Sequence, residues 1–148
     1  MRLLLINGPN LNTLGKRQPH IYGTLALREI EARVAERAAE RGVEIRCFQS
    51  NHEGAIIDFI QAEAEEAQGI IINPGALTHY GLSLRDALEG CGLPFIEVHL
   101  SDIHSREPFR RHSVMVDIAA GQISGQGWEG YLRALDALAA LVREEGRE

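Results

Sequence analysis

The chain has 148 residues, of which 45% are hydrophobic and 24% charged, a balance typical of one globular domain with its own core. Its net charge of −6 argues against a general nucleic-acid-binding protein, and no apolar run approaches the ~20 residues of a membrane-spanning helix. The two cysteines, Cys47 and Cys91, have neither disulfide-framework nor metal-site spacing, so we expect both to be buried and reduced in a cytoplasmic protein.

A short apolar run, Leu3–Ile6, predicts a buried first strand, and a long polar loop follows it over residues 7–23. A connection between a strand and a helix usually needs only about 2–6 residues. This loop contains three asparagines, two prolines and, near its end, Arg17 and Tyr22. We interpret it as a functional loop on a rigid strand end; the alternative is a long polar turn with a surface tyrosine.

A first long helix is predicted after this loop, with Thr24 as its N-cap and Gly42 as its C-terminal stop. Apolar residues spaced by three and four positions place on its buried face Leu27, Ile30, Val34 and Ala38. The sequence pattern of residues 43–48 predicts the second strand.

The middle of the chain repeats the alternation of helix and strand. A second helix is expected to bury one face made of Ile57, Ile60, Ala64 and Ala67. The run Ile70–Ile72 predicts a central parallel strand, because uninterrupted apolar residues are typical of a strand covered on both faces. A third helix, which contains Leu84 and Leu88, is expected to end at Gly90.

The last third predicts a fourth strand at Phe95–His99, a basic loop over 100–113 and a short fifth strand at Val114–Ile118. A final helix is expected to bury Leu132, Leu135, Leu138 and Val142. Five strands alternating with four helices predict an open parallel α/β sheet with right-handed crossovers. For a chain of this length we expect one domain over residues 1–148, a flavodoxin-like three-layer sandwich with strand order 2-1-3-4-5.

In such a sheet, ligands bind outside the carboxyl ends of the strands. Polar segments follow the first, third and fourth predicted strands, over residues 7–22, 73–79 and 99–110. All three should therefore meet at one edge of the sheet, which predicts a functional site there.

Two residue pairs in these segments suggest proton transfer. A tyrosine such as Tyr22 removes a proton only as phenolate, a form that a nearby guanidinium such as that of Arg17 favours. Glu97 and His99 are two positions apart in a strand, so their side chains share one face. A carboxylate beside an imidazole suits a general acid. Taken alone, Glu97 and His99 can equally be structural, and for Arg17 and Tyr22 two unrelated surface residues are the simpler alternative.

Two further groups suggest substrate binding. Asn73 and His79 flank backbone amides that can hold hydroxyl groups or an anion, and Arg106, Arg110 and Arg111 suit a small anionic substrate, since arginine binds carboxylates in a bidentate way. The alternatives are a capped turn and a solvated run of charge. We find no zinc-ligand spacing and no phosphate-binding glycine motif after the first strand.

Taken together, these motifs resemble the type II 3-dehydroquinate dehydratases. The matching segments are Ile6–Asn12, Leu14–Arg17, Tyr22–Gly23, Gln49–Gly54, Asn73–Ala76, Thr78–His79, Leu84–Ala87, Glu97–Ser101, Arg106 and Phe109–His112. They cover essentially the whole chain in the family's order and spacing. Departures lie at Tyr80–Gly81 and Gln126–Glu129, away from the reactive positions.

The resemblance implies a trans dehydration of 3-dehydroquinate to 3-dehydroshikimate through an enolate-like intermediate, with no cofactor and no metal. By that likeness Tyr22 is the base that takes the proton next to the ketone, and Arg17 stabilises its phenolate. His99 is the acid that protonates the departing hydroxyl, and Glu97 orients it. Asn10 holds a water that faces the enolate oxygen.

The resemblance also implies a set of residues that bind the substrate, namely Asn73, Gly75, His79, Leu100, Ser101 and Arg110. Asp86 is expected to enter the site from a neighbouring subunit, in a homododecamer built as a tetramer of trimers. The alternative function is a flavin- or nucleotide-binding module on the same fold without this activity. Neither reading predicts binding to nucleic acid or to a membrane.

Overall fold

The computed structural model describes residues 1–16 and 18–147, which form a five-stranded parallel sheet in the order β2-β1-β3-β4-β5. The strands are β1 (Arg2–Asn7), β2 (Glu44–Gln49), β3 (Gly69–Asn73), β4 (Phe95–His99) and β5 (Gly121–Ser124). The predicted parallel α/β sheet and its strand order are therefore confirmed.

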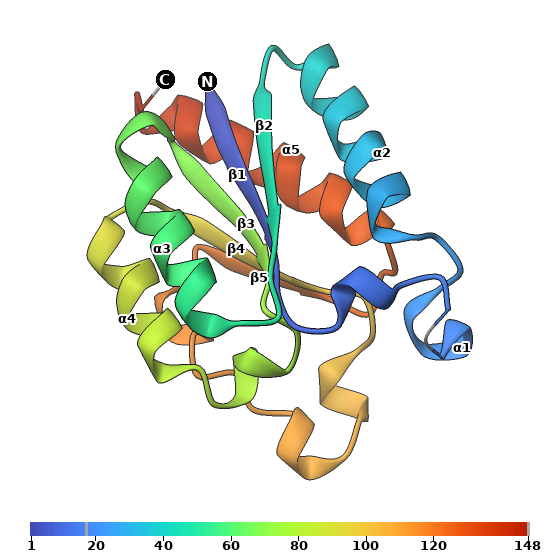
Figure 1. Ribbon diagram of the computed structural model, residues 1–148. Helices are drawn as coiled ribbons and strands as arrows, with labels where there is room; N and C mark the ends of the chain where they lie inside the picture. Colours follow the sequence, from blue (N-terminus) through green and yellow to red (C-terminus); the bar gives the residue numbers. More distant parts are fainter. Residues whose placement is uncertain (17, 148) are drawn as a thin grey trace.

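In the described part of the chain, helices cover both faces of this sheet (Figure 1). One face carries α2 (Leu27–Glu40) and α5 (Glu129–Glu144), the other carries α3 (Glu53–Glu63) and α4 (Leu82–Cys91), and a short α1 (Pro19–Tyr22) lies in the loop after β1. Short 3₁₀ helices occupy the connections: η1 (Leu11–Thr13), η2 (Ala64–Glu66), η3 (Gly75–His79), η4 (Ile103–Ser105), η5 (Pro108–Arg110) and η6 (Val116–Ile118). No helix within residues 1–16 and 18–147 has the length and apolarity needed to cross a membrane.

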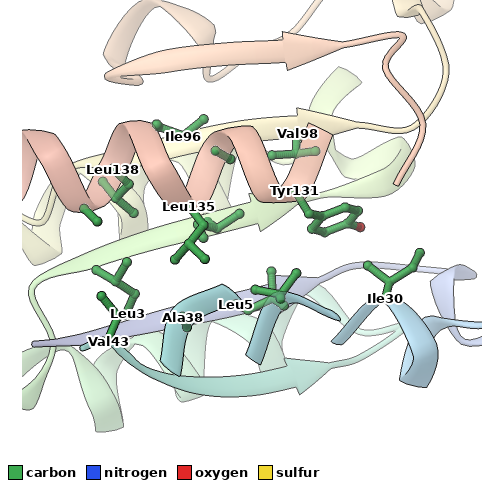
Figure 2. Close-up of a cluster of buried hydrophobic side chains, with 14 of the residues drawn as sticks. Leu3, Leu5, Ile30, Ala38, Val43, Ile96, Val98, Tyr131, Leu135 and Leu138 are labelled. Carbon is green, nitrogen blue, oxygen red and sulfur yellow. The ribbon is translucent and has the colours of Figure 1, made fainter. Parts of the chain in front are cut away.

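The sheet separates two apolar layers. Leu3, Leu5 and Ile71 pack toward α2 and α5, in the cluster that Figure 2 shows in part. The alternating residues Leu4 and Ile6 pack toward α3 and α4. Successive side chains of a strand point to opposite faces, so β1 and β3 need apolar residues at every interior position, which explains their lack of polar alternation.

The register places the polar strand ends side by side. Asn7 of β1 pairs with Asn73 of β3, and Ile72 of β3 pairs with Glu97 of β4. The carboxyl ends of three adjacent strands therefore meet at one edge of the sheet, as predicted. The N-terminus and the end of α5 lie at the opposite end of the sheet (Figure 1).

The prediction of a fifth strand at Val114–Ile118 is wrong, because β5 lies at Gly121–Ser124 and pairs with β4. The earlier segment leaves the sheet plane: Met115 is fully buried against the α3 and α4 layer, and Arg85 bonds Asp117. Within this segment Met115 fills the core, whereas Val116 is exposed and begins the 3₁₀ helix η6.

Two helix boundaries also differ from the prediction. α2 begins after Ala26 rather than at Thr24, and the Ala26 backbone N–H donates to the Glu29 carboxylate at 3.1 Å. α4 continues through Gly90 to Cys91, and its C-cap is Gly92, whose φ of +74° is the left-handed conformation that glycine adopts without strain.

Two predicted buried faces are confirmed at Ile60, Ala67, Leu135, Leu138 and Val142, but three other predicted residues are not fully buried. In α3 the fully buried residues are Ile56 and Ile60, spaced by four, whereas Ile57 is only half-buried, as is Ala64 in η2. In α5 the core residue is Tyr131. Its neighbour Leu132 is only half-buried, contrary to the prediction.

The expected burial of the cysteines is not observed. Cys47 is exposed and Cys91 is half-buried, and both are free thiols. Cys47 lies on β2, an edge strand of the sheet. An edge strand has a neighbouring strand on one side only and is less covered by helices, so its residues are more exposed to solvent.

Gly8 offers a test of the close approach between the loops after β1 and β3. A Cβ atom at this position would lie 2.4 Å from the Pro74 carbonyl oxygen, which is backbone and cannot rotate away. We expect Gly8→Ala to lower the free energy of unfolding by about 1–3 kcal/mol, which corresponds to roughly 2–4 °C in Tm per kcal/mol. Differential scanning calorimetry measures the shift.

Gly54→Ala is the matched control, because a Cβ there meets nothing within 4 Å and the position lies in α3. Alanine favours a helix over glycine by up to ~1 kcal/mol, so this variant should keep or raise the Tm. Equal Tm values for the two variants would show that the loops separate without cost.

Candidate active site

A pocket opens at the carboxyl edge of β1, β3 and β4. Its empty space is about 540 Å³, open mouth included. The predicted site residues that line it are Asn10, Tyr22, Asn73, Gly75, His79, His99, Leu100, Ser101 and Arg110. Residues far apart in the sequence are thus brought together where the sheet topology predicts.

Two predicted residues within the described part of the chain do not line this pocket. Glu97 lies behind His99 and is fully buried. Asp86 is exposed on α4 and lines a separate groove between α3 and α4. Arg17 lies outside the described residues. Within those described residues, no group of three or more His, Cys, Asp or Glu side chains is placed to hold a metal ion.

Glu97 and His99 form a buried pair at the end of β4. His99 Nε2 lies 2.5 Å from Glu97 Oε2, and two hydroxyl groups also donate to the carboxylate, Thr78 at 2.5 Å and Ser113 at 2.9 Å. An ionised carboxylate only accepts hydrogen bonds, so His99 Nε2 carries a hydrogen. Nδ1 is then the ring nitrogen of His99 that can exchange a proton with a bound molecule.

These contacts determine the charge state of Glu97. Burial alone would raise the pKa of its carboxyl group, but the hydrogen bond and positive charge of His99, with the hydroxyl groups of Thr78 and Ser113, outweigh burial and hold the pKa below its ordinary value. Sequence reasoning missed Ser113 and gave Thr78 no role. Their contacts with Glu97 span 16 and 19 positions and have no local sequence signal.

His79 is oriented by backbone. Its Nδ1 lies 2.8 Å from the carbonyl oxygen of His112. A carbonyl oxygen only accepts, so Nδ1 carries the hydrogen and Nε2 of the neutral ring is an acceptor. The Val114 N–H donates to the Thr78 carbonyl oxygen at 2.7 Å and ties the same two segments together.

The loops after β1 and β3 touch at Gly75. Its φ is +60°, and a Cβ atom there would lie 2.9 Å from the Pro9 carbonyl oxygen. The Gly75 N–H donates to Asn73 Oδ1 at 3.1 Å. Asn10, also with positive φ, receives support from the β2 loop, since Asn51 Oδ1 accepts from its backbone N–H at 2.9 Å. Close backbone packing therefore shapes this wall of the pocket.

Sequence reasoning assigned Arg106, with the other two arginines of the basic loop, to an anionic substrate and gave it no contact with Tyr22. Its Nη1 donates to Tyr22 Oη and to Ser101 Oγ, both at 3.3 Å, and its guanidinium carbon lies 5.7 Å from the centre of the Tyr22 ring. The loop after β4 thus supplies a cation to the tyrosine of α1, 84 positions away.

The other two arginines of the basic loop behave differently. Arg110 lines the pocket and also pairs with Glu107, three positions before it. Arg111 is exposed, and its Nε donates to the Arg106 carbonyl oxygen at 2.8 Å. Two of the three predicted cations therefore face the pocket, and the third stabilises the loop.

Residues 1–139 match the protein family described as Dehydroquinase class II. The chain is 60% identical over 138 residues to the 3-dehydroquinate dehydratase of Roseiflexus castenholzii, which covers 93% of this chain and 88% of the relative. It is 54% identical over 142 residues to catabolic 3-dehydroquinase 1 of Aspergillus fumigatus, covering 96% of this chain and 95% of the relative. The crystal structure of the type II dehydroquinase from Butyrivibrio crossotus superposes with a TM-score of 0.92 at 47% identity, covering 94% of this chain and 97% of that one.

The depressed pKa of Glu97 predicts how stability depends on pH. The folded state favours the ionised carboxylate, so this group stabilises the protein above its unfolded pKa of about 4.3, and the contribution is lost as pH falls through the lower folded pKa. Glu97→Gln has no carboxylate to protonate. Its deficit in unfolding free energy should therefore be larger at pH 7 than in acid, as measured by urea unfolding.

Glu36→Gln, at an exposed position of α2, is the control. It should change the unfolding free energy by less than about 0.5 kcal/mol at either pH. A Glu97→Gln deficit that stays the same from neutral to acid pH would contradict the ionised state of Glu97.

Proposed function

Since this chain belongs to the class II dehydroquinase family, we propose that the pocket described above is where it dehydrates 3-dehydroquinate. The function is that of a type II 3-dehydroquinate dehydratase, a hydro-lyase of the shikimate pathway. The observation that carries the assignment of the site is that one pocket holds Tyr22 and His99, with Glu97 directly behind the imidazole.

The proposed reaction has two proton transfers. The Tyr22 phenolate takes a proton from the carbon next to the ketone, and the electron pair moves onto the ketone oxygen to give an enolate. The enolate then re-forms the ketone as a carbon–carbon double bond forms and the neighbouring hydroxyl leaves with a proton from His99. Water and the conjugated enone 3-dehydroshikimate are the products, and both side chains exchange protons with solvent to complete the cycle.

The phenolate requires a cation beside it. Arg106 donates to Tyr22 Oη at 3.3 Å, which places a guanidinium beside the oxygen that takes the proton. Arg17, which lies outside the described residues, takes the same role by family resemblance. Asn10 lines the pocket and holds the water that faces the enolate oxygen.

The acid role of His99 is supported by its surroundings. The buried negative charge of Glu97 stabilises an imidazolium, and the bond to Nε2 keeps that nitrogen's hydrogen on the Glu97 side. Nδ1 therefore delivers the proton. Thr78 and Ser113 donate to the Glu97 carboxylate, so its negative charge is in place behind the ring before the substrate binds.

The remaining pocket residues bind the substrate. His79 offers Nε2 as an acceptor, and Asn73 with the Gly75 turn offers amide groups. Leu100 and Ser101 line the wall after β4, and Arg110 pairs with the substrate carboxylate. These groups orient the ring so that the reacting carbon faces Tyr22 and the leaving hydroxyl faces His99.

Asp86 completes a neighbouring copy's site in a homododecamer of four trimers. The support is its location: Asp86 is exposed and lies away from its own chain's pocket, on a groove lined also by the half-buried Ile57 and Ala87. Leu82, the first residue of α4, and Tyr80, just before the helix, are each 62% exposed and add apolar surface there.

The enzyme works in the cytoplasm, without a cofactor or a metal, as a single catalytic domain over residues 1–148. Both cysteines are free thiols, which suits a reducing compartment. The direct test of the function is an absorbance assay for the conjugated enone with 3-dehydroquinate as substrate, before and after dialysis against a chelator. We expect equal activity in both. A protein that is yellow or carries a nucleotide, and gives no enone, would contradict the function.

Mixing two inactive variants should restore part of the activity if Asp86 acts across a subunit boundary. Tyr22→Phe removes the oxygen that takes the proton, and Asp86→Ala removes the carboxylate given to a neighbour, so each homogeneous enzyme should lose most turnover. In a mixed oligomer, a pocket works when its own subunit keeps Tyr22 and its neighbour keeps Asp86. Random mixing makes about a quarter of the pockets complete. The measurement is kcat of the co-refolded mixture.

The control is Tyr80→Phe, which removes a hydroxyl group from an exposed tyrosine outside the pocket and should keep full activity. If the mixed oligomers assemble but remain inactive, Asp86 acts in the pocket of its own subunit and not in that of a neighbour. Normal turnover of Tyr22→Phe alone would mean that another group is the base.

A further inference from the structure

Three buried polar side chains form a layer behind the pocket. Asn7 and Asn73 are register partners at the ends of β1 and β3, and Tyr131 reaches them from α5. All three are at most 3% exposed. In Figure 2, Tyr131 lies at the end of the apolar cluster nearest the strand arrowheads, and its hydroxyl oxygen points away from Leu135 and Leu138.

The hydrogen bonds of this layer run in one direction. The Gly75 backbone N–H can only donate, and it donates to Asn73 Oδ1 at 3.1 Å, so the amide nitrogen of Asn73 faces Tyr131. Asn73 Nδ2 then donates to Tyr131 Oη at 2.9 Å. The Tyr131 hydroxyl donates in turn to Asn7 Oδ1 at 2.6 Å. Both ends of the Asn73 amide are therefore held.

We propose that Tyr131 is a positioning residue for the dehydration, acting through Asn73. Of the three side chains, Asn73 lines the pocket. One hydrogen of its Nδ2 is used by Tyr131, and the second is left to bond a substrate hydroxyl. Tyr131, with Asn7 behind it, fixes the rotation of the amide so that this second hydrogen keeps its direction. The inference rests on the proposed function, because it assigns a substrate group to Asn73.

A role in packing alone does not account for this arrangement. A phenylalanine would fill the same apolar space on α5, and burial raises the pKa of Tyr131, so its hydroxyl remains a neutral donor. Asn7 also has a buried Nδ2 with no hydrogen-bond partner among the described residues. Burying an unpaired amide hydrogen is unfavourable, whereas two apolar side chains in place of Asn7 and Tyr131 would avoid that cost. The layer therefore contains a chain of directed hydrogen bonds at a place where apolar packing alone would be more stable.

The test is steady-state kinetics of Tyr131→Phe with 3-dehydroquinate. Loss of one restraint on a binding group should raise KM by roughly fivefold to tenfold, while kcat stays within about twofold. Ile71→Val is the matched control: Ile71 is fully buried on β3, two residues before Asn73 and on the same sheet face. It removes one methylene without touching the layer, so its KM should be unchanged.

A double variant separates positioning from general weakening. If Tyr131 acts through Asn73, Tyr131→Phe should add nothing to the KM of Asn73→Ala, because the positioned group is already absent. Asn7→Leu, which removes the acceptor of the Tyr131 hydroxyl, should raise KM in the same direction. It serves as the second probe if Tyr131→Phe folds poorly.

Two results would overturn the inference: an unchanged KM in both Tyr131→Phe and Asn7→Leu, or KM effects of Tyr131→Phe and Asn73→Ala that multiply in the double variant. Both leave the proposed function intact, because they require an active parent enzyme. An unsubstituted protein that makes no enone would instead contradict the function itself.

Discussion

The parallel pairing of β1, β3 and β4 is the constraint on which the site depends. It brings the ends of three strands to one edge, with Asn7 beside Asn73 and Glu97 one strand further along. A slip of one residue in either pairing would turn each of these side chains to the opposite face of the sheet. The fully buried apolar runs of β1 and β3 exclude such a slip, because both faces of the sheet are filled. The apolar core therefore determines the geometry of the polar site.

The two faces of the sheet support different parts of the chemistry. Glu97 and His99 point toward the α3 and α4 layer, where Thr78 and Ser113 complete the hydrogen bonds of the carboxylate. Asn73 points toward the α2 and α5 layer, where Tyr131 holds its amide. The proton donor and the binding amide are thus fixed by separate sets of contacts, and each is oriented before a substrate arrives. Such preorganisation is what electrostatic stabilisation of a transition state requires.

Much of this arrangement is predictable from the sequence, and the exceptions have physical reasons. β4 matches its predicted bounds, and the convergence of three loops follows from the topology. The fifth strand is an exception: Val114–Ile118 is rich in apolar residues but forms a bend and the 3₁₀ helix η6, and β5 begins only at Gly121. Arg106 and Tyr131 have no local signal, since their contacts link positions 84 and 58 apart. An aromatic residue on a helix face predicts core packing, and only the fold shows where its hydroxyl points.

The central claim is that His99, held by the ionised Glu97, supplies the proton to the departing hydroxyl. The most direct measurement is the kcat of His99→Ala, together with the affinity of the variant for a non-reacting substrate analogue. A general acid contributes typically ~10²–10⁴-fold, so kcat should fall by that factor while the analogue binds with nearly unchanged affinity. A variant with near-normal kcat, or one that loses analogue binding and turnover in equal measure, would contradict this role of His99.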